Sequence, residues 1–373
     1  MARRWPEHFG GSDPAASLAD IEQRTLDALR AALERNGVEP CVSSSKLTAA
    51  ARAHARHLLA AGTPPGRIDA DMVRREARRE GAYDPTVVPW AIGFHGDIDL
   101  ESRVARLARR VASRPPTHCG IGHAVTDERQ VLVVVGVRRR VQLEAVPSRL
   151  ASGNRVRLEG TLAPGYQAPA VMVTSPLGEV GERQVLRRAG WFGTWLELEG
   201  VGRHTVEVMA TGPRGPEIVA LFPISVDSEP WEGTDEDMAL AVRPVEDLAS
   251  IAARLLELLN LERQQAGLLP LMHSSQLDRL AANHSRDMLM QGYFGHVSPG
   301  EGDLTARLRG AGISTPRAAE NLVRSVSSSR AHDRLMESPS HRANILDPSL
   351  THVGIGLARS AGELVVTQIF VSW

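Results

Sequence analysis

Y-F-G-H-V-S-P at residues 293–299, A-E-N-L at 319–322 and S-P-S-H-R-A-N-I-L at 338–346 are the three stretches of sequence that decide the fold. They contain two histidines, His296 and His341, and one carboxylate, Glu320. Side chains this far apart along the chain can form a site only if a folded domain brings them together. We therefore expect the last third of the chain to be a domain built around them.

His296 is expected on a loop. It follows an aromatic residue and a glycine and precedes Ser298-Pro299, which is typical of a segment that leaves the end of a helix. A histidine on such a loop is more available for chemistry than one on a buried helix face. Taken alone, it could also serve only to hydrogen-bond its own loop.

Glu320 and His341 have structural interpretations as well. A carboxylate in A-E-N-L could cap a helix or accept backbone N–H groups. Ser338-Pro339 is a suitable N-cap and first-turn pair, which places His341 in the first turn of a helix that runs to Leu346. The positive end of that helix disfavours protonation, so His341 should be a neutral imidazole that is able to bind a metal.

Length and composition indicate a soluble globular protein of two or three domains. The chain has 373 residues, of which 42% are hydrophobic and 23% charged, with a net charge of −1. So small a net charge gives no reason to expect nucleic acid or an anionic membrane surface as a partner. No apolar run reaches the roughly 18–20 residues of a membrane span.

Two features bear on the cellular compartment and leave it open. The two arginines near the N-terminus are followed by no apolar stretch, so this is not a complete secretory signal. Either the protein stays inside the cell or a leader has been removed. The two cysteines, Cys41 and Cys119, allow at most one internal disulfide, and a pair of buried thiols is the alternative.

The two ends of the chain repeat each other. LTAAARAHARHLLAAG at 47–62 aligns with LDRLAANHSRDMLMQG at 277–292 at an offset of 230 (277 − 47). THCGIG at 117–122 aligns with THVGIG at 351–356 at an offset of 234 (351 − 117). A helical block and a later strand are thus both present twice, which predicts two copies of one domain. His54 and His284 match each other on the repeated helix, so we interpret both as scaffold.

Hydrophobic periodicity places the elements of the two copies. In the first copy we expect a helix that begins at Leu18, further helices at 46–61, 68–81 and 98–113, a loop at 87–93 and a buried strand at 131–137. In the second copy we expect helices at 244–266, 275–291, 303–311 and 329–346, followed by strands at 354–358 and 364–371.

The middle of the chain has a different pattern. Short strand-like runs alternate with Gly/Pro turns at spacings of about ten residues, which favours a small antiparallel sandwich with Trp191 and Trp195 in its core. The expected domain plan is a flexible tail at 1–17, the first copy at 18–142, the sandwich at 143–227, an acidic linker at 228–243 and the second copy at 244–373.

The ordered motifs of the last domain resemble those of a known family. F-x-H-x-S-P, E-N-L, S-P-x-H-R-x-N-I-L, H-V-G-I-G and T-Q-x-F occur in this order. They resemble the bacterial, SCP-like branch of the CAP superfamily, the cysteine-rich secretory, antigen 5 and pathogenesis-related 1 proteins. The resemblance implies an α-β-α sandwich with a central cleft. The expected fold class is therefore α+β, with two CAP-like α-β-α sandwich domains separated by a small all-β (immunoglobulin-like) sandwich.

The resemblance also implies site residues. Many members of the family line the cleft with two histidines and two acids, and some bind zinc or another divalent ion there. His296 matches the first histidine and Glu320 the first acid. The second acid corresponds to Ser338, which is not acidic, although Glu337 is adjacent.

The second family histidine corresponds to Val365 and is absent. We expect His341 to take its place, with His296 and His341 as the candidate metal ligands.

The first copy lacks the polar set. At the offset of 230, Gly66 stands in place of His296, and residues 87–93 contain no acid. In the first copy, the segment that would match 338–346 is shorter, and residues 114–117 lead directly into the strand. Side chains needed only for packing should occur in both copies, so His296, Glu320 and His341 are predicted to form a site.

Two functions of different classes are compatible with such a site. In the first, an extracellular or envelope protein binds a lipid, glycan or peptide, or a divalent metal such as Zn²⁺, in the C-terminal cleft. In the second, a metal-assisted hydrolase uses Glu320 as a general base. No serine or cysteine lies in a nucleophile motif of the second copy, and metal catalysis usually requires three protein ligands. We therefore favour binding.

Overall fold

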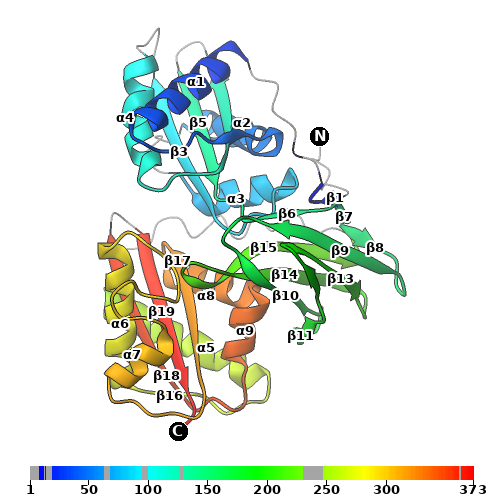
Figure 1. Cartoon of the computed structure of the whole chain (residues 1–373), viewed down its shortest axis with the longest axis vertical. Coiled ribbons are helices and arrows are strands. Elements are labelled where there is room, and N and C mark those ends of the chain that lie inside the picture. The colour runs from blue at the N-terminus through cyan, green and yellow to red at the C-terminus, as the bar shows by residue number, and fades with distance from the viewer. Residues whose placement is uncertain are drawn as a thin grey trace. The chain divides into compact units, whose positions relative to one another are not determined.

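The computed structural model describes residues 8–11, 13, 19–62, 68–94, 100–126, 129–229, 247–360 and 363–373. The chain divides into two compact units, whose elements are labelled in Figure 1. The first comprises residues 1–164, 185–204 and 219–233, and the second comprises residues 165–184, 205–218 and 234–373. Two pieces of the middle of the sequence therefore belong with the C-terminal helices and sheet.

The N-terminal helices flank a four-stranded sheet. The helices are α1 (Asp20–Arg35), α2 (Ser45–Ala60), α3 (Ala70–Arg79) and α4 (Leu100–Ala112). The strands, in the order β2-β4-β5-β3, are β2 (Val42–Ser43), β4 (His118–Val125), β5 (Gln130–Val137) and β3 (Val87–Phe94). Alternate residues of β5 enter two apolar clusters, one with α1 and α4 and one with α2 and α3. The continuous β-branched run of β5 is thus explained by burial on both faces.

The C-terminal helices and strands have the same layered plan. The helices are α5 (Leu248–Gln265), α6 (Ser275–Met290), α7 (Leu304–Gly310), α8 (Ser328–Glu337) and α9 (Pro339–Ile345). The sheet has the order β16-β18-β19-β17, with β16 (Met272–His273), β18 (His352–Ser360), β19 (Glu363–Val371) and β17 (Ala318–Ser325). One apolar cluster joins α5 and α8 to the sheet, and another joins α6 and α7 to it (Figure 1).

The two sheets agree in direction and register. Met272 pairs with His352 in parallel, and Val42 pairs with His118 in parallel. These pairs are related by the offsets of the repeated sequence segments, 230 (272 − 42) and 234 (352 − 118). In both sheets a glycine lets a helix approach closely, because a Cβ on Gly122 or Gly356 would lie about 2 Å from the backbone of α2 or α6.

The two cysteines form a disulfide. Cys41 precedes β2 and Cys119 lies in β4, with their Cα atoms 5.8 Å apart. Of the two alternatives left open by the sequence, the bond is therefore the one found.

The middle of the chain forms two further sheets. The first has the order β11-β10-β14-β15-β8, with β11 (Val180–Arg183), β10 (Gln167–Thr174), β14 (Gly202–Gly212), β15 (Gly215–Val226) and β8 (Arg149–Leu150). The second has the order β12-β13-β9-β6, with β12 (Leu186–Arg188), β13 (Trp191–Glu197), β9 (Arg155–Leu162) and β6 (Val141–Leu143). All pairs with a described register are antiparallel except β15 with β8.

The expected tryptophan core is wrong. Trp195 is 53% exposed and Trp191 is partly exposed, whereas Phe192 and Leu196 are fully buried. Side chains alternate along a strand, so the core takes the even-numbered residues of β13 and leaves both tryptophans on the other face. The large size of a tryptophan did not decide which face is buried.

Three other expectations require correction. Residues 87–93 are not a loop but lie in strand β3, and Glu320 caps no helix because it lies in strand β17. The expected helix at 329–346 is two helices, since Ser338 ends α8 and caps α9. Proline at the next position has no N–H and cannot continue a helix, but it can begin one.

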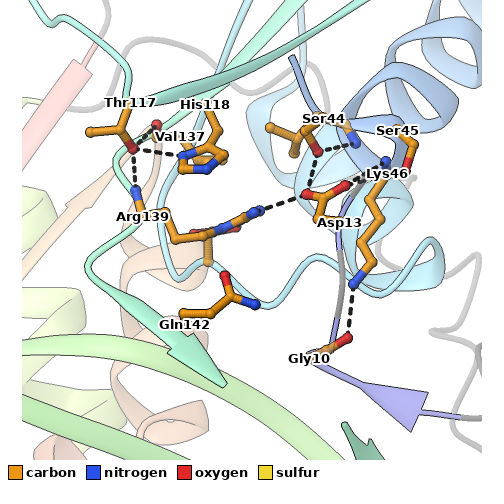
Figure 2. A network of polar contacts seen from close by, with 12 residues as sticks. Gly10, Asp13, Ser44, Ser45, Lys46, Thr117, His118, Val137, Arg139 and Gln142 are labelled. Atoms are coloured by element: carbon orange, nitrogen blue, oxygen red, sulfur yellow. Dashed lines mark hydrogen bonds and ion pairs between the residues drawn. The ribbon is translucent and has the colours of Figure 1, made fainter. Parts of the chain in front are cut away.

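The described part of the N-terminal segment is anchored rather than loose. β1 (His8–Phe9) pairs with β7 (Val146–Pro147). The Asp13 carboxylate accepts hydrogen bonds from Ser44 Oγ at 2.6 Å and from Arg139 Nη1 at 2.9 Å. Figure 2 shows how these side chains converge on Asp13. Because Ser44 is the N-cap of α2, Asp13 adds negative charge at the start of this helix.

Some expectations concern residues outside the described ranges. These are most of the tail at 1–17, the helix start at Leu18, Gly66 and most of the linker at 228–243.

Candidate functional site

Glu320 is the centre of a group of polar side chains at β17. Its Oε1 is 2.8 Å from Nδ1 of His296, and its Oε2 is 2.8 Å from Nη2 of Arg307. The side chains of Glu320 and Arg307 are 2% and 0% exposed. The buried carboxylate of Glu320 contacts both the imidazole of His296 and the guanidinium of Arg307. It thus links the loop that follows α6 to helix α7. We call His296, Glu320, Arg307 and His341 the histidine–glutamate cluster.

Glu320 is ionised at neutral pH. Burial alone would raise its pKa, but the hydrogen bond from His296 and the charge of Arg307 outweigh burial and hold the pKa below its ordinary value of 4.5. An ionised carboxylate can only accept hydrogen bonds, so Nδ1 of His296 carries the proton of this contact. Nε2 of His296 is left to interact with another group.

The His296 loop is held by partly buried hydrogen bonds. Asp287, in the last turn of α6, accepts from Tyr293 Oη at 2.5 Å and from Ser298 Oγ at 2.8 Å. The His296 side chain remains 23% exposed. The loop placement expected from the sequence is therefore found, and one ring nitrogen is fixed while the ring stays partly open to solvent.

His341 lies in the first turn of α9, as the Ser338-Pro339 pair predicts. Ser338 Oγ accepts from the His341 N–H at 3.4 Å. On β17, Asn321 Nδ2 donates to the His341 carbonyl at 3.1 Å and also contacts Gln368 Oε1. Successive side chains of a strand point to opposite faces, so Glu320 binds α7 and the His296 loop while Asn321 binds α9.

The imidazole of His341 is neutral. The side chain is half-buried, and burial, aided by the charge of nearby His296, lowers the pKa of His341 to about 3. Neither ring nitrogen of His341 is hydrogen-bonded to any other residue in the described part of the chain. Nitrogens on both rings are therefore available to a ligand.

The two other predicted site residues lie at the junction of α8 and α9. Ser338 is buried and its Oγ donates to Glu207 Oε2 at 2.5 Å, so it faces a strand of the middle segment. Glu337 is the last residue of α8 and is half-buried. The structure therefore brings His296 and Glu320 into direct contact, and it gives Ser338 a role in holding α9.

Sequence reasoning missed four residues. Arg307, Asn321 and Glu207 were not singled out, and His284 was interpreted as scaffold. His284 is fully buried and 3.9 Å from Glu320 Oε1, and its Nε2 contacts the Gly295 carbonyl at 3.0 Å. Burial lowers the pKa of His284, so it acts as a neutral donor that supports the loop. The match of His284 to His54 hid this contact, whereas nothing local distinguished Arg307 from a surface arginine.

The cluster does not fit a firmly held metal ion. Zinc sites in proteins normally use three or four ligands. Glu320, the only carboxylate in the cluster, is engaged by His296 and by the positively charged Arg307, which disfavours a cation beside it. Across the described ranges, no three or more His, Cys, Asp or Glu side chains are grouped so that they could hold a metal.

Helices on both faces of a mixed four-stranded sheet, with a glutamate on the edge strand that contacts a loop histidine, define an α-β-α sandwich of the class that the motifs resemble. The family comparison agrees, because residues 256–370 match the model described as "CAP: Cysteine-rich secretory protein family". The C-terminal part of this chain is a bacterial-type CAP domain.

Two curated relatives are similar over about a third of this chain. The "Uncharacterized protein YkwD" of Bacillus subtilis (strain 168) is 36% identical over 119 residues, which are 32% of this chain and 46% of YkwD. The "Uncharacterized membrane protein YlbC" of the same organism is 33% identical over 107 residues, or 28% of this chain and 31% of YlbC. The similarity thus spans less than half of either relative.

Solved structures are similar at lower identity. An extracellular SCP-domain protein from Bacillus anthracis str. Ames is 22% identical with a TM-score of 0.31, over 51% of this chain and 67% of that one. A cysteine-rich secretory protein from Staphylococcus aureus is 12% identical with a TM-score of 0.30, over 68% and 83%. Within the ranges that the structure describes, no helix is long and apolar enough to cross a membrane.

Proposed function

We propose that this protein acts outside the cytoplasm, where the CAP domain binds a neutral, hydrogen-bonding component of the cell envelope such as a glycan or a peptide. The observation that carries the proposal is the pair of imidazoles with available nitrogens. Nε2 of His296 and both ring nitrogens of His341 have no hydrogen-bond partner among the described residues. Such nitrogens are the groups that would bond to ligand hydroxyls and amides.

The proposed location outside the cytoplasm rests on the disulfide. Bonds such as Cys41–Cys119 form and persist in oxidising compartments and are rare in the cytosol.

Binding is favoured over hydrolysis by the state of Glu320. A general base needs a carboxylate that can reach a substrate proton. Oε1 of Glu320 accepts hydrogen bonds from His296 Nδ1 and Arg307 Nη2, and Oε2 lies 2.8 Å from Arg307 Nη2 without a hydrogen bond of its own. The side chain is only 2% exposed, so burial and the ion pair keep it from a substrate proton. We infer that Glu320 orients the His296 ring and compensates the charge of Arg307, and that the hydrolase is the weaker alternative.

We also propose that residues 18–142 are a degenerate second copy of the domain, separated by the β-rich segment at 143–227 from the copy at 244–373. The shared strand order and register support this. Pro89 pairs with Val135 and Glu320 pairs with Ile369, and these pairs occupy equivalent places in the two sheets. A proline in place of the central carboxylate leaves the first copy with a scaffold role.

The test is calorimetric titration of the full chain with a soluble muropeptide, which offers both glycan and peptide groups. We expect binding that His296→Ala/His341→Ala weakens about tenfold or more, since two hydrogen bonds are lost. His273→Ala is the matched control, because His273 is an exposed histidine of the same domain paired with Asp278.

Three results would contradict the proposal. They are no binding by the wild type, equal binding by the double variant, and cleavage of the muropeptide that disappears in Glu320→Gln. A zinc titration of the same proteins should give at most weak binding, and a tight site lost in the double variant would restore the metal hypothesis.

A further inference from the structure

Glu207 is a buried carboxylate that the site described so far does not use. It lies in strand β14 of the middle segment and is fully buried. Its Oε2 accepts from Ser338 Oγ at 2.5 Å, and its Oε1 accepts from the Ser340 N–H at 3.1 Å. Burial raises the pKa of Glu207, and the hydrogen bonds from Ser338 and Ser340 act in the opposite direction. Burying a carboxylate costs free energy, so the groups that hydrogen-bond to Glu207 indicate its role.

Those partners surround His341. Ser338 is the N-cap of α9 and accepts from the His341 N–H. The hydrogen bond that its hydroxyl donates to Glu207 fixes the orientation in which the Ser338 oxygen can accept. On the other side of His341, Arg342 Nε donates to the Gly178 carbonyl, between β10 and β11, at 3.0 Å. The turn of helix that carries His341 is therefore fastened on both sides by residues of the middle segment, one in β14 and one between β10 and β11.

The same strand leads to the loop that carries His296. β14 ends at Gly212, and the Arg214 carbonyl accepts from the Val297 N–H at 3.0 Å. The Arg214 guanidinium lies 5.0 Å from the centre of the Tyr293 ring. Gly215 has a φ of +94°, and a Cβ there would be 3.2 Å from Cβ of His296. Glu207, Arg214 and Gly215 belong to the same compact unit as the CAP helices and sheet.

We propose that β14, the turn after it and the start of β15 are a positioning element of the histidine–glutamate cluster, in which Glu207 sets the position of His341 and Gly215 that of His296. The inference deepens the proposed function, because it assigns the geometry of the binding site to residues outside the family's own domain. His341 and His296 are carried by different segments, and the hairpin of β14 and β15 contacts both of these segments.

The test is an NMR titration of the histidine rings in the full chain, without ligand. In Glu207→Ala, the first turn of α9 loses its anchor and the His341 ring becomes more hydrated. Its pKa should rise from about 3 toward the ordinary 6.5, by about one unit or more. Glu207→Gln keeps one carbonyl acceptor and should largely restore the wild-type value. Val208→Ala removes a buried side chain of the same strand that points to the opposite face, and it should leave the pKa of His341 unchanged.

A second pair of variants covers the case in which Glu207→Ala does not fold. Gly215→Ala and Gly165→Ala both place alanine at a positive φ, +94° and +85°, but a Cβ on Gly165 meets nothing within 4 Å. Only Gly215→Ala should shift the resonances of His296. An unchanged His341 pKa in folded Glu207→Ala, or equal effects of the two glycine variants, overturns the inference. Because no ligand is present, failure of muropeptide binding would not produce either result.

Discussion

The Glu320–Arg307 pair should contribute strongly to the stability of the CAP domain. Its two charged groups are 2.8 Å apart and sealed from solvent. Nε and Nη1 of Arg307 have no hydrogen-bond partner in the described structure, so Glu320 and the His296 carbonyl provide most of its compensation. Glu320→Leu leaves a buried, uncompensated guanidinium. Removing one partner of a buried pair costs about 3–5 kcal/mol, and we expect a loss of that size.

A double-mutant cycle separates this charge effect from simple loss of packing. Arg307→Met leaves a buried carboxylate and should cost a similar amount to Glu320→Leu. The double variant replaces the pair with apolar groups. Its loss of unfolding free energy should therefore be smaller than the sum of the losses in the two single variants by about 2 kcal/mol or more. The measurement is urea unfolding at pH 7, followed by circular dichroism. Additivity of the two single changes within about 0.5 kcal/mol would refute the reasoning.

The pH dependence of stability tests the same interaction between Glu320 and Arg307. The pKa of Glu320 is lowered in the folded protein, so its contribution is fully present above the ordinary value of 4.5 and is lost as the pH falls below it. The wild type should therefore lose stability on acidification from pH 5, and the double variant should lose less. Parallel pH profiles of the two proteins would show that Glu320 is not the group responsible.

Two other predictions concern the scaffold. Cys41→Ser/Cys119→Ser opens a loop with a sequence separation of 78 residues. It should lower the free energy of unfolding in urea by about 4 kcal/mol, and a loss below about 1 kcal/mol would contradict this. Gly356→Ala places a Cβ 1.9 Å from the Ala282 nitrogen of α6 and should cost about 3 kcal/mol or more in thermal unfolding. Gly310→Ala is the control, because a Cβ at Gly310 meets nothing within 4 Å, and it should change stability by about 0.5 kcal/mol at most. Equal effects of the two glycine variants would be inconsistent with close packing of α6 on the sheet.

The sequence by itself determined several of the helices, the buried strand β5 and the cap at Ser338. Apolar spacing placed α2, α6 and β5 to within a residue or two, and Ser338-Pro339 correctly predicted that His341 lies in the first turn of a helix. These features depend on neighbours within about one turn of the chain, so they can be recognised from a short window. The motif order likewise identified the CAP domain, since the family match covers the residues that carry it.

Only the tertiary structure decided which side chains meet. Glu320 contacts Arg307 because β17 pairs with β19 in one register and lies beside α7, and a shift of one residue would have turned Asn321 to that face instead. Glu207 contacts Ser338 across more than a hundred positions of sequence (338 − 207 = 131). The same alternation buried Phe192 and exposed Trp195. Strand register and the packing of distant segments determine which side chains pair with a buried charge. Neither can be recognised from a short stretch of sequence.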